Sequence, residues 1–151
     1  MSLSDSFPDG FKKDFAQRNL KIGSVIRLYV GDTNPPKQKR FILVGQSYDK
    51  LLFAAIFINS EINPNIFPTQ ELKDLNLKLT ASERDYLDRD SYADCSNIQK
   101  RSADWLLKII GEDPSRVIGE VSDADMKEIR ARIKSARTIA PAVKKTFGLF
   151  L

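Results

Sequence analysis

Apolar residues alternate with polar ones from Ile22 to Val30, and this period of two predicts a β-strand. Two continuous apolar runs follow, and the short polar segment 48–50 joins them, so they predict a β-hairpin. Shorter apolar stretches predict further strands, and one of them fits a strand or a helical turn equally well. The predicted strands are Ile22–Val30, Arg40–Ser47, Leu51–Asn59, Leu75–Thr80 and Ser91–Ile98, and the ambiguous segment is Trp105–Ile110.

Helical spacing marks both ends of the chain. Three phenylalanines at four-residue intervals predict a helix within Ser4–Arg18. Near the C-terminus, Ser122 is a suitable N-cap for a second helix, which Pro141 would end. The apolar stripes are Phe7, Phe11 and Phe15 in the first helix, and Met126, Ile129, Ile133, Ala136 and Ala140 in the second.

Together these elements predict a fold that is mainly β, of the α+β class, in which short strands form a small, strongly bent β-barrel. We expect a single domain over residues 1–151, because a chain of this length fits one hydrophobic core. In this scheme residues 1–20 form an N-terminal helical extension, residues 22–122 the barrel with inserted loops, and residues 123–140 the C-terminal helix.

The composition excludes several kinds of catalytic site. The chain has no histidine and one cysteine, Cys95, so serine–histidine and cysteine–histidine nucleophiles and histidine-bound zinc are ruled out. We therefore expect neither a metal nor a cofactor, and we expect Cys95 to be a small buried residue. The net charge of +4 and the pI of about 9.2 favour an anionic partner, and nucleic acid is the first to consider.

Nothing in the sequence predicts membrane insertion or secretion. No apolar run reaches the roughly 18 residues of a membrane span, and the N-terminus lacks the apolar region of a signal peptide. A lone cysteine also allows no intramolecular disulfide, so we expect a cytoplasmic protein without a membrane partner.

A basic cluster lies around the start of the second predicted strand. Lys37, Lys39 and Arg40 follow a polar loop with two prolines. A cation that opens a buried strand is costly unless it stays at a wet edge or meets an anion. Asn59 and Ser60 end the third predicted strand, so the hairpin would bring them beside this cluster. The combination predicts a phosphate-binding site.

Arg27 and Tyr29 share a face of the first predicted strand, where they would stack on a base and contact a phosphate. Two other charged groups are expected to be mainly solvent-exposed. The basic one has a less favoured alternative use as a docking groove for an acidic partner. These groups are Glu83, Asp85, Asp88 and Asp90 in a loop, and Lys127, Arg130, Lys134 and Arg137 on the C-terminal helix.

Four segments, in chain order, carry a family likeness. They are the glycine-led strand Gly23–Val30, the basic strand start Lys39–Val44, the strand end Ile58–Ile62, and Val117–Ser122 before an amphipathic helix. In this order the chain resembles the MazF/PemK-type toxins of toxin–antitoxin modules. The resemblance spans about residues 22–139.

The resemblance implies an SH3-like barrel and a metal-independent endoribonuclease that acts on single-stranded RNA. Matched by position, the catalytic roles fall to Arg40 and Ser60. Arg40 would stabilise charge on the phosphate while the ribose 2′-hydroxyl attacks it, and Ser60 would hydrogen-bond a phosphate oxygen. The implied partners are RNA and a cognate antitoxin protein, and the implied assembly is a homodimer.

A second function remains open from the sequence. An SH3-like module without catalytic activity would use the same concave face to bind nucleic acid, a protein or a peptide. Loss of RNA turnover in Arg40→Ala distinguishes the two functions.

Overall fold

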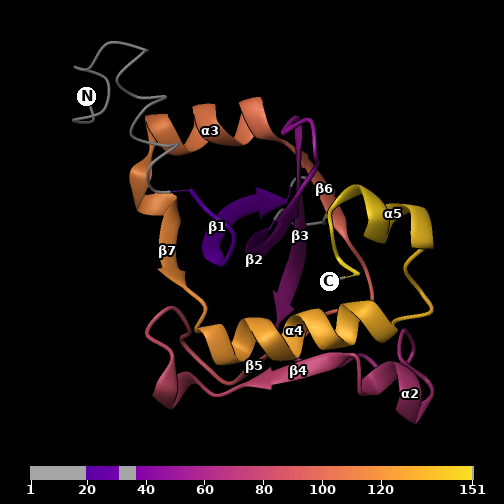
Figure 1. Ribbon diagram of the computed structural model, residues 1–151. Coiled ribbons are helices and arrows are strands. Elements are labelled where there is room, and N and C mark those ends of the chain that lie inside the picture. Colours follow the sequence, from indigo (N-terminus) through magenta and orange to yellow (C-terminus); the bar gives the residue numbers. More distant parts are fainter. Residues whose placement is uncertain (1–19, 31–36, 151) are drawn as a thin grey trace.

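Seven strands build one antiparallel sheet in the computed structural model, which describes residues 20–30 and 37–150 (Figure 1). The helix predicted within Ser4–Arg18 lies outside the described residues. The strands are β1 (Ser24–Val30), β2 (Lys37–Gln46), β3 (Leu52–Asn59), β4 (Asn76–Leu79), β5 (Ser91–Asp94), β6 (Gln99–Ser102) and β7 (Val117–Glu120).

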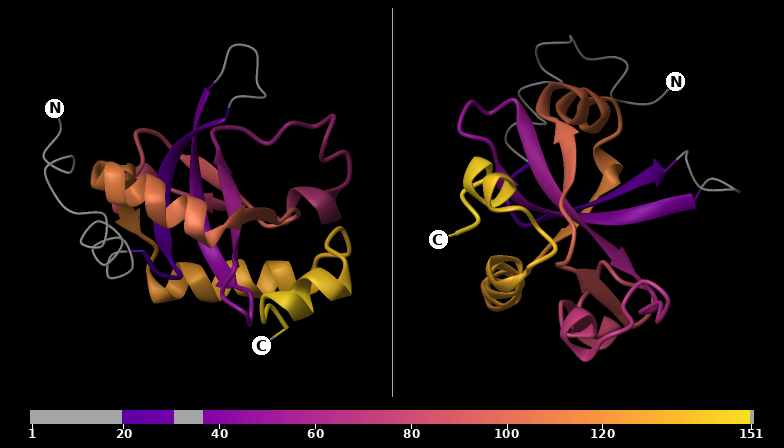
Figure 2. Two further views of the ribbon diagram at one scale, coloured as in Figure 1. Left: turned by 90° about the horizontal axis from the view of Figure 1, so that it is seen from above. Right: turned by 90° about the vertical axis from the view of Figure 1, so that its right-hand side faces the viewer.

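The sheet curls because β3 has two different partners along one of its edges. The strand order is β4-β5-β3-β2-β1-β7, and β6 also pairs with β3. The first half of β3 pairs with β6, whereas Ile58 and Asn59 at its end pair with β5. The sheet therefore turns about β3 and forms a half-barrel (Figure 2). An α+β fold with a strongly bent sheet is confirmed.

The predicted hairpin is formed by β2 and β3. Its turn is closed by Ser47, whose Oγ donates to Asp49 Oδ1 at 2.6 Å and accepts from the Leu52 N–H at 3.0 Å. β2 begins at Lys37 rather than at Arg40, because the backbone before Arg40 still pairs with β1.

Two helices cover the sheet, α3 (Ala103–Glu112) and α4 (Asp123–Ser135). Figure 1 shows β1, β2 and β3 between these helices. Each helix packs on its own apolar cluster. Short helices complete the chain, namely α2 (Gln70–Lys73), α5 (Pro141–Thr146) and the 3-10 turns η2 (Ala81–Glu83) and η3 (Pro114–Arg116).

The two apolar clusters follow the alternation of the strands. The α3 cluster joins Leu106 and Ile110 to sheet residues such as Phe41. The α4 cluster joins Ile129 and Ile133 to the alternate sheet residues, which point to the opposite face of the sheet. The main sheet members are Ile26, Leu28, Phe41 and Leu43 in the first cluster, and Val25, Ile42, Val44 and Ile56 in the second.

The structure decides one open alternative and corrects one strand prediction. Trp105–Ile110, open between a strand and a helical turn, belongs to α3, because Ser102 Oγ accepts from the Trp105 N–H at 3.3 Å and caps a helix there. The predicted strand Ser91–Ile98 is too long. It ends as β5 at Asp94, whose carboxylate accepts from the backbone N–H two residues later and turns the chain.

The C-terminal helix is shorter than the predicted 123–140. Ser122 caps its start, as predicted. The helix ends at Ser135, where the buried Lys144 Nζ donates to the carbonyl oxygen of Ala136 at 2.8 Å. A cation bonded to the last carbonyl groups is favourable at a helix C-terminus.

Beyond α4 the chain turns and starts another helix. Ala140, predicted on the apolar stripe, is exposed and precedes α5. Pro141 is the first residue of α5, a position where proline is well tolerated because its missing N–H has no partner there.

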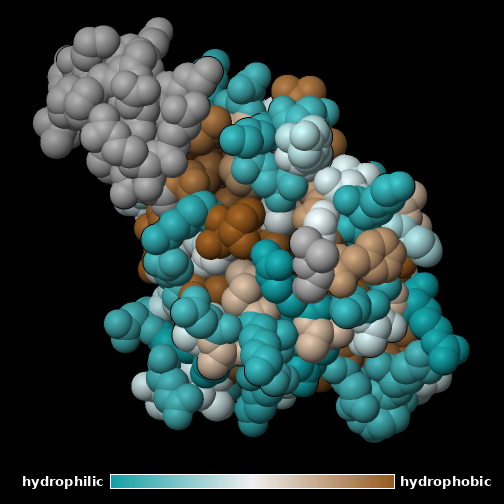
Figure 3. Space-filling view, viewed as in Figure 1, coloured by the Kyte–Doolittle hydropathy of each residue, from teal (hydrophilic) through white to brown (hydrophobic). Residues whose placement is uncertain are grey.

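Polar side chains cover α4 on the face shown in Figure 3, and apolar side chains gather between α3 and α4. Among residues 20–30 and 37–150, no helix is both long and apolar enough to cross a bilayer.

Candidate nucleic-acid interface

Three of the candidate residues share one face of the sheet. Arg27 and Arg40 are directly opposite in the β1–β2 register, so their side chains lie on the same face. Tyr29 lies two residues along β1 on this face and is 63% exposed. We call Arg27, Tyr29 and Arg40 the arginine face. Toward the core it continues into Val25 and Ile42, which belong to the α4 cluster.

Among the described residues, Arg40 pairs with one carboxylate, that of Asp88. Its Nη2 donates to Asp88 Oδ2 at 2.8 Å, and the Asp88 side chain is 79% exposed. Arg40 Nε is buried and has no hydrogen-bond acceptor among the described residues. A buried N–H without an acceptor is unfavourable. The guanidinium therefore has an unused donor next to the bond that it makes.

The arginine face carries more positive than negative charge. Within the part of the chain that the structure describes, Asp88 is the only carboxylate that forms an ion pair with Arg27 or Arg40. Like charges directly opposite each other in an antiparallel sheet are destabilising. An anionic ligand at this face would relieve that repulsion.

Lys39 and Asn59 lie on the opposite face of the sheet. Lys39 Nζ donates to Asn59 Oδ1 at 2.7 Å and lies 5.5 Å from the centre of the Phe57 ring. Burial, and to a smaller degree the charge of Lys37, lower the pKa of Lys39. Because adjacent residues of a strand point to opposite sides, the structure does not bring Lys37 and Lys39 together with Arg40.

Ser60 directly follows β3 and is exposed. It comes two residues after Ile58, which is the register partner of Arg40. The Ser60 hydroxyl forms no hydrogen bond with another described residue. Ser60 therefore lies at the strand end nearest to Arg40 in the register, and its hydroxyl is available to a ligand.

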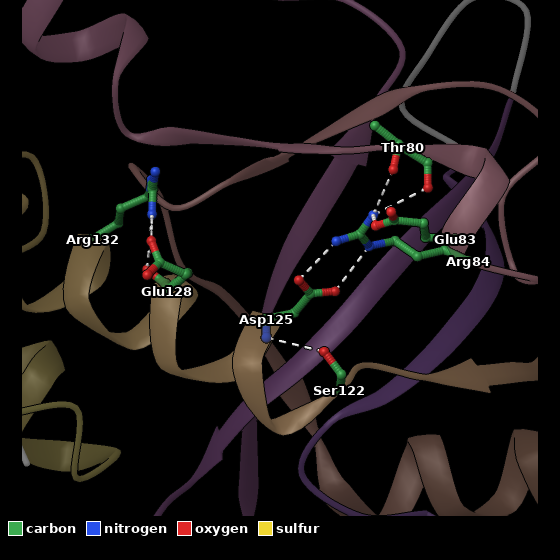
Figure 4. Close-up of polar contacts among 7 residues, drawn as sticks. All are labelled: Thr80, Glu83, Arg84, Ser122, Asp125, Glu128 and Arg132. Atoms are coloured by element: carbon green, nitrogen blue, oxygen red, sulfur yellow. Dashed lines mark hydrogen bonds and ion pairs between the residues drawn. The ribbon is translucent and has the colours of Figure 1, made fainter.

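The loop that carries Asp88 is fixed to α4 at its other end. Arg84 binds the Asp125 carboxylate of α4 through two hydrogen bonds, and its Nη1 also donates to Thr80 Oγ1 at 3.0 Å (Figure 4). The sequence predicts Asp88 in an exposed acidic loop but does not predict its contact with Arg40. Those two residues are 48 positions apart, and only their opposite charges hinted at the pair.

The chemistry available here is hydrogen bonding and charge stabilisation. Among the described residues, no group of three or more metal-ligating side chains could hold a metal ion. Cys95 is fully buried, and burial raises the pKa of its thiol to about 12. A thiol with such a pKa supplies no thiolate nucleophile at neutral pH.

The basic residues of α4 form a separate surface. Lys127, Arg130 and Lys134 line a shallow pocket of about 420 Å³ on the outer side of this helix. Arg137, predicted on the same stripe, lies beyond the end of α4 and pairs with Glu71 at 3.5 Å. The basic group predicted on the C-terminal helix therefore has three members on α4 instead of four.

No protein-family model matches the chain, and no curated protein is detectably similar to it in sequence.

Proposed function

We propose that this protein is a metal-independent endoribonuclease of the MazF/PemK type that cleaves single-stranded RNA. The observation that carries the proposal is the arginine face. Arg27 and Arg40 lie side by side next to the exposed Tyr29, and one exposed carboxylate is their described counter-ion. Closely spaced guanidinium groups beside an exposed aromatic ring suit a phosphate chain with unstacked bases.

The order of the elements supports the same proposal. A basic second strand carries Arg40, the third strand ends at Asn59 and is followed by Ser60, and β7 leads into α4. This is the order in which the sequence resembles the MazF/PemK family. We propose accordingly that the half-barrel is an SH3-like barrel, that the protein acts as a homodimer, and that an antitoxin protein is its second partner.

The proposed reaction is an internal transfer at phosphorus. The ribose 2′-oxygen bonds to the adjacent phosphorus and the bond to the 5′-oxygen breaks, which leaves a 2′,3′-cyclic phosphate and a 5′-hydroxyl. Water takes the proton of the 2′-hydroxyl and supplies one to the leaving 5′-oxygen. Arg40 stabilises the charge that builds on the non-bridging oxygens. A guanidinium donates hydrogen bonds and has no acceptor atom, so its role is electrostatic.

The other candidate residues position the chain in this proposal. Arg27 binds a neighbouring phosphate, Tyr29 stacks on a base, and Ser60 donates to a phosphate oxygen. Lys37, Lys39 and Asn59 lie on the other face of the same strands. These three residues therefore contact the RNA backbone only where the RNA passes the ends of the strands.

The test of the reaction is incubation of the purified protein with a long single-stranded RNA in EDTA. We expect fragments that end in a 2′,3′-cyclic phosphate. The same RNA with 2′-O-methyl riboses should stay intact, because it lacks the attacking hydroxyl. Fragments from the methylated RNA, or fragments that form only with added Mg²⁺, would contradict the proposed chemistry.

The second candidate function is an SH3-like binding module without catalytic activity. The observation that favours it is the state of Arg40, whose guanidinium is bonded to Asp88 with no histidine in the chain to act as a base. Binding of the methylated RNA without cleavage of ordinary RNA would select this function.

A further inference from the structure

Asp88 occupies the position on Arg40 that an anionic ligand needs. We infer that Asp88 is a built-in competitor of the RNA phosphate, and that it determines which anions the arginine face accepts. The identity of the ligand, a phosphodiester of single-stranded RNA, rests on the function proposed above. The competition itself rests on the geometry of the Arg40–Asp88 pair.

Two arginine–carboxylate pairs, each with one residue in the loop after β4, differ in the number of hydrogen bonds that they make. Arg84 uses Nε and Nη2 together, at 2.9 and 2.8 Å from the two oxygens of Asp125. Arg40 uses only Nη2, on one oxygen of Asp88, and its Nε has no described acceptor. Arg84–Asp125 is thus a side-on pair with both hydrogen bonds formed, whereas Arg40–Asp88 has only one of the two.

A phosphodiester would complete the arrangement at Arg40. It offers two non-bridging oxygens, which match the parallel N–H donors of a guanidinium edge. When it replaces Asp88, one oxygen takes over Nη2. Because Nε is buried, the guanidinium turns toward the ligand to bring the unused Nε to the other oxygen. The ligand therefore gains a hydrogen bond that Asp88 does not make.

The exposure of the two carboxylates fits this role. Asp88 is 79% exposed, so it returns to water at little cost when it is displaced, whereas Asp125 is only 14% exposed. Asp90, two residues from Asp88, accepts from the backbone N–H of Ala81 at 2.9 Å, so the loop stays anchored while Asp88 moves.

The competition makes the arginine face selective. A small free anion that displaces Asp88 gains contacts with Arg40 only. We therefore expect it to bind poorly. A single-stranded RNA also contacts Arg27 and Tyr29 in the same event, so its additional contacts offset the displacement. Asp88 thereby favours a phosphate chain over free anions.

The experiment measures fluorescence anisotropy of a labelled 2′-O-methyl oligonucleotide, which binds without being cleaved. The variants are Asp88→Asn and the control Asp85→Asn. The control removes the same charge from an exposed position in the same loop, where no described residue is paired with it. Each substitution is also made in an Arg40→Gln background, and thermal unfolding verifies that every variant folds.

We expect Asp88→Asn to tighten binding by about two- to fivefold more than Asp85→Asn, the range for loss of an exposed ion pair. The extra gain should vanish in the Arg40→Gln background. Equal effects of the two substitutions, weaker binding by Asp88→Asn, or a gain that persists without Arg40 would each overturn the inference, and so would no binding by any form.

Together with the cleavage assay on ordinary RNA in EDTA, this binding experiment separates the inference from the proposed function. If Asp88→Asn shows its Arg40-dependent gain in affinity but ordinary RNA is not cut, the role of Asp88 as competitor is supported and the nuclease function is contradicted. If ordinary RNA is cut in an Arg40-dependent way but Asp88→Asn and Asp85→Asn change the affinity equally, the nuclease function is supported and the role of Asp88 as competitor is contradicted.

Discussion

Arg84 and Asp125 form a side-on pair between the loop after β4 and the first turn of α4, with Nε 2.9 Å from Oδ2 and Nη2 2.8 Å from Oδ1. Both side chains are about 85% buried, since they are 15% and 14% exposed. Asp125 raises the pKa of Arg84, mainly through their hydrogen bonds. The pair fixes the loop that presents Asp88 to Arg40.

Breaking this pair should destabilise the fold. We expect Arg84→Met to lower the free energy of unfolding by about 2–3 kcal/mol, because it leaves the Asp125 carboxylate poorly solvated and unpaired. Urea unfolding measures this change. Glu128→Gln is the matched control, because it breaks the exposed Arg132–Glu128 pair and should cost at most about 0.5 kcal/mol. Equal costs would show that Arg84 contributes no more than a surface pair.

The N-cap of α4 allows a second test. Ser122→Ala removes the oxygen that accepts from the Asp125 N–H at 3.1 Å, and we expect a loss of about 1 kcal/mol in unfolding free energy. Ser122→Asp keeps an acceptor at this position and should retain most of the stability. If Ser122→Ala and Ser122→Asp lose the same amount, the hydroxyl does not act as a cap.

Gly45 allows a third test, because it lies where the C-terminal segment approaches β2. A Cβ at this position would lie 2.9 Å from the carbonyl oxygen of Phe147 and 3.2 Å from its Cβ. Neither of these atoms is the end of a flexible side chain. We expect Gly45→Ala to cost about 1–3 kcal/mol in chemical unfolding, as in an overpacked core. An unchanged unfolding midpoint would show that the segment after α5 moves aside freely.

The buried thiol of Cys95 should make the stability of the fold depend on pH in the alkaline range. Burial raises the pKa of its thiol from 9.0 to about 12, so the folded state keeps a proton that the unfolded state loses between these values. The stability that Cys95 contributes is therefore full below pH 9 and is lost as pH rises toward 12. Unfolding free energies should fall more steeply above pH 9 in the wild type than in Cys95→Ala. Parallel pH profiles of the two proteins would contradict this.

The sequence predicts the hairpin well because its signal is local. Apolar runs flank a short polar turn, and Ser47 and Asp49 close that turn by themselves. The extent of α3 was missed although Ser102 is an N-cap type and Leu106 and Ile110 have helical spacing. A window of six residues, Trp105–Ile110, was too short to show that spacing.

The candidate site was predictable only in part. The period of two along β2 already implies that Lys39 and Arg40 lie on opposite faces, once Lys37 is recognised as part of the strand. The pairing of Arg40 with Asp88 depends on how the curled sheet brings a distant loop to β2. No local pattern encodes such a contact.

The most direct test of the central claim is the rate of RNA cleavage in EDTA by Arg40→Ala beside Arg101→Ala. Both substitutions remove one guanidinium, but Arg101 lies 5.2 Å from the Phe41 ring, whose residue belongs to the α3 cluster rather than to the arginine face. We predict that Arg40→Ala slows cleavage by about 100-fold or more and that Arg101→Ala cleaves close to the wild-type rate. Equal rates for Arg40→Ala and the wild type, with both proteins folded, would contradict the assignment of the arginine face as the catalytic site.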